Sequence, residues 1–311
     1  MKGIGEQGNS LKVAILGAGG IGKVHARIFH SLGAEIYAIL GSSTKTASES
    51  SNDLKQSFGF KPKAFANIEE LLAEPIDAVC ICTPPHLHVE HTLAAFNKGF
   101  AVFCEKPLFW NDKMSKTDML LKLDQLKSHP SRRFMMNAPN AFFLEGLNNR
   151  INEPGKIKSF KFSFHTNGNY KGREIGVDLL THGLSLIYKL FGLRNLSLFK
   201  SQTADNKYSC SFRFGNCKVE FDFMEDLNGS KLFLIDIDGH VFTRGQEGFG
   251  AEYNVFLLDS RTNEKIKITD PFQQSISNFL DYCKSGSPIG HDKFEEAEVI
   301  MKIMIQNLLV S

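Results

Sequence analysis

The first 127 residues alternate short apolar runs with longer stretches of helical periodicity. Four runs are predominantly apolar and short enough for buried strands, at residues 11–16, 35–40, 78–82 and 100–104. Helical patterns follow at residues 20–32, 43–58, 68–72 and 86–97. Strands that are apolar on both faces and alternate with helices are typical of a parallel sheet covered on both sides. This half of the chain is therefore predicted to be an α/β domain of the Rossmann type.

The pattern changes after about Lys127, where His129-Pro130-Ser131 forms a breaker cluster. Strand patterns are predicted at residues 133–136, 156–165, 196–201, 208–214, 218–223, 231–237 and 253–259. Helices are expected at residues 140–152, 176–191, 272–284 and 294–309. Successive strands after a helix favour an open, mainly antiparallel sheet with helices on one face. We therefore predict two domains, residues 1–127 and an α+β domain over residues 128–311.

Composition and charge exclude several classes of protein. The 311 residues are 42% hydrophobic, which is enough for two cores, and 36 Lys and Arg against 34 Asp and Glu leave a net charge of +2. This balance gives no reason to expect nucleic acid or a membrane surface as partner. No apolar run approaches the roughly 20 residues that cross a bilayer. Residues 1–10 are polar and glycine-rich, unlike a secretory signal, and are expected to form a loose tail of a soluble, cytoplasmic protein.

The six cysteines do not indicate a metal site. None forms a CxxC pair, and no Cys/His spacing suits zinc. Cys80, Cys82 and Cys104 lie inside apolar runs, so we expect buried, reduced thiols and no bound metal.

A glycine-rich turn follows the first apolar run directly. Gly17, Gly19 and Gly22 match GxGxxG at the head of a predicted helix, with Gly20 and Ile21 inside the same turn. The first glycine permits a tight turn, the second lets the backbone approach a pyrophosphate, and the third allows close packing of helix on strand. Amide groups and the helix dipole then hold phosphates. The segment predicts a dinucleotide-binding site.

The end of the second apolar run bears on which dinucleotide binds. An Asp or Glu there would hold the ribose 2′-hydroxyl and favour NAD. The chain has no carboxylate at this place, and Ser42, Ser43 and Lys45 offer hydroxyls and a positive charge to a 2′-phosphate. We therefore predict NADP, with NAD as the alternative. The serines can also cap the following helix, and both roles can coexist.

Two further segments follow predicted strands, where open α/β sheets bind ligands. They are Thr83-Pro84-Pro85-His86-Leu87-His88 and Glu105-Lys106-Pro107. The residues predicted to border the cofactor are Thr83, Pro84, His88, Glu105 and Lys106. Lys106 also has the reach to hydrogen-bond a substrate hydroxyl. A lysine before proline is otherwise a surface residue, and that alternative stays open at this point.

Together with the glycine turn, these segments resemble the Gfo/Idh/MocA family, which takes its name from glucose-fructose oxidoreductase and inositol dehydrogenase. The resemblance extends to Glu153-Pro154-Gly155-Lys156-Ile157 and to residues 270–272, 279–281 and 285–288, so it covers nearly the whole chain. It implies an NAD(P)-dependent oxidoreductase. The substrate would be a small sugar, cyclitol (polyol) or nucleotide-sugar that exchanges a hydride with the nicotinamide. The family also includes regulators without chemistry, so a non-catalytic nucleotide sensor is the alternative.

The resemblance also implies catalytic residues in the predicted helix 176–191. Asp178 and His182 match the family's Asp and His at positions i and i+4, about 6 Å apart on one helix face. By this analogy His182 exchanges the hydroxyl proton, Asp178 orients it, and Lys106 polarises the reacting oxygen. Without the resemblance, His182 is an ordinary helix histidine.

Two departures prevent the family's substrates from being carried over. Ser185 stands where members often have Asp, and residues 136–142 lack the usual Arg. Candidate substrate contacts are Asn137, Lys171 and Arg173, although the last two can equally be solvated loop charges. Phe160, Phe162 and Phe164 are interpreted as core and sheet-face residues. Such a sheet often packs on another subunit in this family, so a homo-oligomer, dimer or tetramer, is expected.

Overall fold

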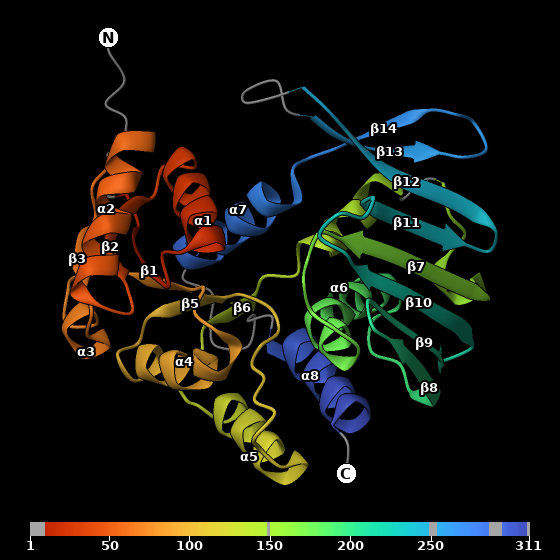
Figure 1. The fold of residues 1–311 in the computed structure, drawn as a ribbon, viewed down its shortest axis with the longest axis horizontal. Coiled ribbons are helices and arrows are strands. Elements are labelled where there is room, and N and C mark those ends of the chain that lie inside the picture. Colours follow the sequence, from red (N-terminus) through yellow and green to blue (C-terminus); the bar gives the residue numbers. More distant parts are fainter. Residues whose placement is uncertain (1–9, 148–149, 249–253, 286–293, 310–311) are drawn as a thin grey trace. The chain divides into compact units, whose positions relative to one another are not determined.

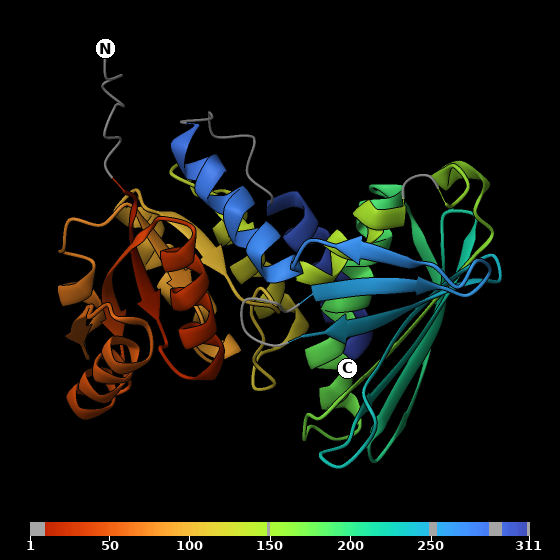
Figure 2. The ribbon, with the colours of Figure 1, turned by 90° about the horizontal axis from the view of Figure 1, so that it is seen from above.

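The computed structural model describes residues 10–147, 150–248, 254–285 and 294–309. The chain divides into two compact units (Figures 1 and 2). One comprises residues 1–109, 124–137 and 276–294, and the other comprises residues 110–123, 138–275 and 295–311. The tail predicted at residues 1–10 lies almost wholly outside the described residues, and so do residues 286–288 of the family-like ending.

The first unit is built on a parallel sheet, as predicted, and this sheet has six strands. Its strands, in the order β3-β2-β1-β4-β5-β6, are β3 (Lys63–Phe65), β2 (Glu35–Leu40), β1 (Lys12–Leu16), β4 (Ala78–Ile81), β5 (Ala101–Cys104) and β6 (Phe134–Met136). The chain runs outward from β1 to β2 and β3, then returns to β4 on the other side of β1. The carboxyl ends of β1 and β4 thus flank a topological switch point, where open α/β sheets bind ligands.

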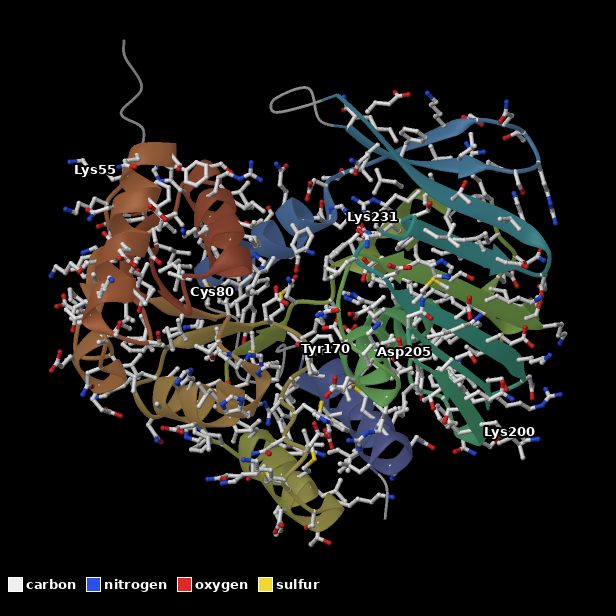
Figure 3. All side chains as sticks on the ribbon, in the orientation of Figure 1. Lys55, Cys80, Tyr170, Lys200, Asp205 and Lys231 are labelled. Carbon is white, nitrogen blue, oxygen red and sulfur yellow. The ribbon has the colours of Figure 1, made fainter. Side chains whose placement is uncertain are left out.

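Helices cover this sheet because its strands are apolar on both faces. They are α1 (Gly20–Ser31), α2 (Thr44–Phe58), α3 (Ile68–Leu71), α4 (His88–Asn97) and α7 (Pro271–Lys284). Phe279 on α7 contacts Phe29 on α1 and Phe103 on β5, with ring centroids 6.1 and 5.2 Å apart. A helix from the end of the sequence therefore completes the first core. Cys80 lies inside this sheet, whereas Lys55 is at the surface (Figure 3).

The second unit contains an eight-stranded, mainly antiparallel sheet, which confirms the predicted fold class. Its strands, in the order β14-β13-β12-β11-β7-β10-β9-β8, are β14 (Lys265–Ile268), β13 (Asn254–Asp259), β12 (His240–Glu247), β11 (Leu232–Ile237), β7 (Ser159–Thr166), β10 (Cys217–Glu225), β9 (Lys207–Phe214) and β8 (Leu196–Ala204). Of the strand pairs within the described residues of this sheet, β7–β10 alone is parallel.

One face of this sheet is covered by α6 (Arg173–Phe191). Phe160 and Phe162 on β7 are fully buried there. A Cβ on Gly183 would lie 2.6 Å from the ring of Phe221 on β10, so the glycine allows α6 to lie directly on the sheet. Thr181 on α6 also contacts the Sδ atom of Met304 on α8 (Phe294–Leu308) at 3.3 Å. The phenylalanine face is thus packed against the chain's own helices.

Several elements differ from the prediction. The helix expected at residues 140–152 is instead the 3₁₀ segment η2 (Pro139–Leu147), and residues 148–149 lie outside the described part. Residues 139–144 are buried in succession rather than on one stripe, so packing on all sides overrides the helical period. The pattern did not indicate the strands β3, β12 and β14 or the helix α5 (Lys116–Lys127). Tyr253, the predicted start of β13, is not described.

Within the described ranges, no helix has both the length and the hydropathy needed to cross a bilayer.

Candidate active site

The glycine turn after β1 is packed so tightly that side chains would not fit. Gly17 has φ +92° and donates its amide hydrogen to Leu40 O at 3.0 Å. A Cβ on Gly17 would lie 2.7 Å from Cys82 O, and one on Gly22 would lie 2.1 Å from Gly17 O. These contacts explain why the first and third glycines are required. They bring α1 close to the carboxyl ends of β1 and β4.

The middle of the same turn is open instead. Among the described residues, a Cβ on Gly19 or Gly20 would meet no atom within 4 Å, and Ile21 is 37% exposed. No side chain caps the first turn of α1, and no acidic residue lies in it. Backbone amides at an uncapped helix N-terminus, beside a space left by glycines, form an anion-binding site. The turn therefore fits the pyrophosphate of a dinucleotide.

The turn after β2 uses its hydroxyl groups to begin α2. Ser43 is the N-cap residue: its Oγ accepts the amide hydrogen of Thr46 at 3.2 Å, and the Thr46 hydroxyl completes a capping box. Ser42 Oγ lies 3.3 Å from Thr46 Oγ1. Lys45 is exposed and forms a long ion pair of 3.9 Å with Glu49. Helix capping, the alternative left open for the serines, is thus present in the structure.

His88 joins the two polar turns that follow β4 and β5. Its ring nitrogens lie 2.7 Å from Thr83 O and 3.0 Å from Pro107 O, and the side chain is buried. Burial lowers the pKa of His88, although its hydrogen bonds to backbone oxygens oppose this shift. Thr83 Oγ1 is 3.0 Å from His91 Nδ1. The imidazole of His88 therefore holds these turns together, and Pro84 is the N-cap residue of the short 3₁₀ segment η1 (Pro85–Leu87) within the first turn.

Glu105 is the centre of a buried polar cluster. Its Oε1 lies 2.5 Å from His25 Nε2 and accepts a hydrogen bond from Asn137 Nδ2 at 2.7 Å. Its Oε2 accepts the amide hydrogen of Lys106 at 3.1 Å. Burial by itself would raise the pKa of Glu105, but the hydrogen bond and charge of His25, with the Asn137 amide, lower it to about 2. The ionised carboxylate fixes the backbone from which the half-buried Lys106 side chain extends.

This cluster changes the interpretation of two residues. Asn137, a predicted substrate contact, is buried and donates its amide hydrogen to Glu105. His25 was not singled out from the sequence. It lies three residues after Gly22 among the apolar residues of α1, which is the ordinary pattern of a core histidine. The peptide bond between Lys106 and Pro107 is cis.

Asp178 and His182 lie one turn apart on α6, in the second unit. His182 is 9% exposed, and its ring meets the edge of Phe164 with centroids 5.2 Å apart. Asp178 is half-buried. Ser185 is buried on the same helix, and its hydroxyl donates to His182 O at 3.0 Å. One rigid element therefore presents both candidate catalytic groups.

Lys171 and Arg173, the remaining predicted substrate contacts, bind other parts of the second unit. Lys171 forms an exposed ion pair of 3.2 Å with Asp205. Arg173 donates to Asp112 Oδ1 at 2.7 Å and to Leu308 O at 3.1 Å. Trp110 Nε1 donates to the same carboxylate at 3.1 Å. Arg173 thus ties α6 to segments distant in the sequence.

Comparison with known proteins gives consistent matches. Residues 11–127 match the model of a family described as an oxidoreductase family with an NAD-binding Rossmann fold. The chain is 30% identical over 307 residues to inositol 2-dehydrogenase of Corynebacterium glutamicum, covering 89% of this chain and 87% of that one.

Other relatives match over a shorter stretch. Inositol 2-dehydrogenase of Agrobacterium fabrum is 35% identical over 104 residues, which cover 32% of this chain and 29% of that protein. The chain thus matches about a third of the length of several curated relatives. The fold is similar to UDP-N-acetylglucosamine 3-dehydrogenase from Acidithiobacillus ferrooxidans, with a TM-score of 0.71, 16% identity and coverage of 96% of both chains.

Proposed function

This chain belongs to the Gfo/Idh/MocA oxidoreductase family, and we propose on that basis that it is an NAD(P)-dependent dehydrogenase or reductase acting on a CH–OH group. The observation that carries the proposal is the glycine turn at the switch point between β1 and β4. Its middle glycines leave open space beside an uncapped helix N-terminus. This arrangement suits the phosphates of a dinucleotide.

The residues that would hold the cofactor come from four strand ends of the first unit. The turn Gly17–Gly22 would hold the pyrophosphate, Ser42 to Lys45 the adenosine ribose, and Thr83, Pro84 and the Glu105-Lys106 turn the rest of the molecule. When bound, the nicotinamide supplies a site that accepts or donates hydride. The protein contributes alignment, which the His88 and Glu105 hydrogen bonds maintain.

Proton exchange is assigned to His182. At a pH near neutrality, a histidine can accept a hydroxyl proton during oxidation and return it during reduction. Asp178, one turn earlier on α6, orients the imidazole and stabilises its protonated form. Lys106 donates a hydrogen bond to the reacting oxygen and so stabilises negative charge that develops there. These roles rest on the family resemblance and on the positions of the residues in their elements.

The substrate is proposed to be a sugar, a cyclitol or a nucleotide-sugar. Relatives named inositol 2-dehydrogenase and glucose-6-phosphate 3-dehydrogenase support this class. We also keep the prediction of a homo-oligomer, a dimer or tetramer, which multi-angle light scattering of the purified protein checks directly.

NADP is proposed as the preferred cofactor. The turn after β2 has hydroxyl groups and Lys45 but no carboxylate to repel a 2′-phosphate. Solved structures of similar fold contain NAD in one protein and NADP⁺ in another, so the fold is compatible with both cofactors.

The first experiment is a fluorescence titration of the purified protein with NADPH and with NADH, after removal of any cofactor that co-purifies. We expect NADPH to bind at least tenfold more tightly, which corresponds to about 1.4 kcal/mol. Preference for NADH would contradict the 2′-phosphate assignment alone. Binding of neither cofactor would contradict the proposed function. Polyols and sugars are then screened as substrates with the preferred cofactor. The absorbance of the reduced cofactor at 340 nm reports the oxidation or reduction of each compound.

A further inference from the structure

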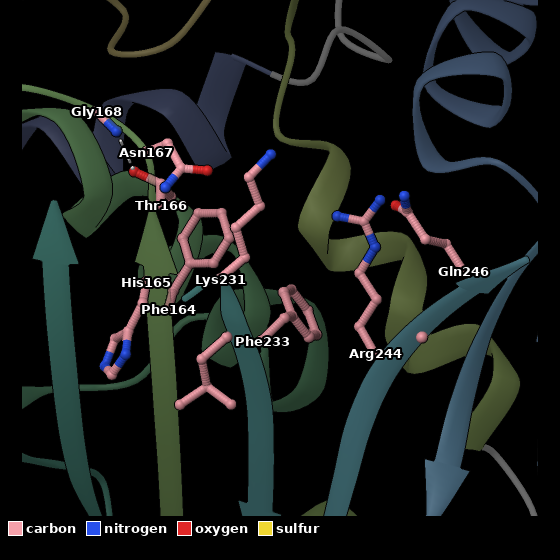
Figure 4. A pocket seen from close by; sticks show the side chains of 11 residues that line it. Phe164, His165, Thr166, Asn167, Gly168, Lys231, Phe233, Arg244 and Gln246 are labelled. Atoms are coloured by element: carbon pink, nitrogen blue, oxygen red, sulfur yellow. Dashed lines mark hydrogen bonds between the residues drawn. The ribbon is translucent and has the colours of Figure 1, made fainter. Parts of the chain in front are cut away.

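The second unit contains a pocket of about 600 Å³ beside the end of β7 (Figure 4). Segments distant in the sequence form its wall, because β11 pairs with β7 and β12 pairs with β11. Phe164 lies opposite Phe233, and Leu234 lies opposite Thr243, which brings the start of β11 beside the end of β12. The lining residues belong to three segments, 164–168, 231–233 and 244–246.

The floor of this pocket is aromatic and reaches the candidate catalytic histidine. The rings of Phe164 and Phe233 have centroids 5.8 Å apart, and Phe233 contacts Phe143 at 4.4 Å. Phe164 also contacts His182, with centroids 5.2 Å apart. A molecule in the pocket would therefore rest on the same phenylalanine that packs against His182. All these contacts lie within one compact unit.

The rim of the pocket is positively charged. Lys231 and Arg244 extend from the ends of neighbouring strands toward the same side, with Gln246 next to Arg244 (Figure 4). The Arg244 guanidinium lies 5.6 Å from the centroid of Phe143, which orients its planar face. The side chains that line the pocket within the described ranges include no carboxylate. This gives the pocket two positive charges over an apolar floor.

Hydrogen bonds hold the polar side chains that follow β7 beside the pocket. Asn167 Nδ2 donates to Asp226 O and Gly229 O, both at 2.9 Å, and Thr166 Oγ1 accepts the amide hydrogen of Gly168. The carboxylate of Glu225 lies behind Gly168 and accepts the Tyr170 amide hydrogen at 2.7 Å. Glu225 is buried and forms part of this support, whereas Lys231 and Arg244 are exposed at the pocket.

We infer that this pocket binds an anionic group, a phosphate or carboxylate, on the substrate of the proposed reaction. The inference rests on the proposed function and specifies its substrate class as an acidic sugar or cyclitol rather than a neutral polyol. The fork of Arg244 matches the oxygens of a phosphate or carboxylate, and Lys231 adds a second charge.

The test compares the binding of matched ligands to the full-length protein. Glucose 6-phosphate, glucuronate and glucose share a ring and differ in charge, and inorganic phosphate is the minimal probe. By calorimetry at low ionic strength, we expect at least one anionic sugar to bind about tenfold or more tightly than glucose. This difference should shrink as salt is added. Comparison of the phosphate with the carboxylate identifies which anion the pocket prefers.

Variants then locate the bound anion. Arg244→Ala and Lys231→Ala should each remove most of the difference between the charged sugars and glucose, and Arg244→Lys should restore part of it. Lys200→Ala is the matched control, since Lys200 is a lysine on β8 of the same sheet (Figure 3). Thermal unfolding verifies that each variant is folded. Phosphate that binds at the N-terminus of α1 instead would be unaffected by Arg244→Ala.

The outcomes separate this inference from the proposed function. Equal affinity for the three sugars, no detectable binding of any anion, or full discrimination in Arg244→Ala would overturn the anion subsite. Turnover of an anionic sugar with unchanged KM in Arg244→Ala would do the same while the dehydrogenase assignment stands. If Arg244→Ala abolishes the difference in affinity between the anionic sugars and glucose, the subsite is supported. This result would stand even if the protein failed to bind NAD(P)H, which would contradict the proposed function.

Discussion

The glycine turn of the parallel sheet and the cationic pocket of the antiparallel sheet both suit anions, but they are constructed differently. In the turn, the backbone of one short segment, residues 17–22, would form the site, and steric crowding requires glycine at Gly17 and Gly22. In the pocket, side chains from β7, β11 and β12 come together only because the strands pair. The residues of the first site are consecutive in the sequence, whereas those of the second are brought together by the register in which β7, β11 and β12 pair.

The difference explains which substitutions each region tolerates. Around Gly22 an added Cβ meets backbone, which cannot move without displacing β1 or α1. At Lys231 and Arg244 the side chains are exposed, so their removal changes charge with little effect on packing. The glycine turn is therefore suited to a cofactor shared by many enzymes. The pocket is suited to a substrate that differs between them.

The largest expected effect concerns the two groups proposed to act on the reacting oxygen, His182 in proton exchange and Lys106 as a hydrogen-bond donor. His182→Ala and Lys106→Ala should each lower kcat by about 10²–10⁴-fold while dinucleotide affinity changes little. Steady-state kinetics with the true substrate and fluorescence titration measure the two quantities. The control variants Lys189→Ala on α6 and Lys98→Ala in the first unit should retain activity. Near-normal turnover in either active-site variant would refute the role of that residue.

The second effect concerns the buried carboxylate behind Lys106. The folded pKa of Glu105, about 2, lies below its ordinary value of 4.5, so the unfolded chain binds more protons between these pH values. The carboxylate therefore stabilises the fold fully above about pH 4.5, and this contribution is lost as the pH falls toward 2. At pH 7 it amounts to about 3 kcal/mol.

Glu105→Gln should lower the free energy of unfolding at pH 7 by up to this amount and flatten its dependence on pH below 4.5. Urea unfolding at a series of pH values measures both changes. Glu35→Gln, an exposed carboxylate on the same sheet, is the control and should change neither. If Glu105→Gln and Glu35→Gln behaved alike, the hydrogen bonds from His25 and Asn137 would not stabilise an ionised carboxylate.

A third effect tests the steric limits of the glycine turn. Gly22→Ala should destabilise the protein by about 1–3 kcal/mol, because its Cβ would overlap Gly17 O. It should also weaken dinucleotide binding by displacing the turn. The control is Gly20→Ala, whose Cβ enters open space. It should retain the stability of the wild type and affect cofactor binding alone. Gly33→Ala does not serve as a control, because Gly33 has a positive φ that strains alanine. Thermal unfolding without cofactor distinguishes the two variants.

The smallest effect is expected at the turn after β2. Lys45→Ala should reduce the preference for NADPH over NADH by about tenfold at most, since its exposed ammonium is screened by solvent. Parallel titrations with the two cofactors measure the ratio, and Lys55→Ala on the same helix is the control. If the ratio were unchanged, Lys45 would not contact the 2′-phosphate, and the contact would be assigned to the hydroxyls of Ser42 and Ser43.

The sequence by itself determined the first unit in most of its detail. Uniformly apolar strands, the glycine spacing and the polar turns at strand ends each act within a few residues, so their physics is visible in a short window. The same holds for Asp178 and His182, which helical periodicity places on one face of α6. Local rules also indicated most strands of the second sheet.

Only the tertiary structure decided how distant segments meet. The sequence did not indicate that α7 would complete the first core, that His25 and Asn137 would hold Glu105, or that Lys231 and Arg244 would share a pocket. It also favoured a helix at η2, where burial on all sides overrides periodicity. These features depend on strand register and close packing, and both arise from contacts between residues that lie tens of positions apart.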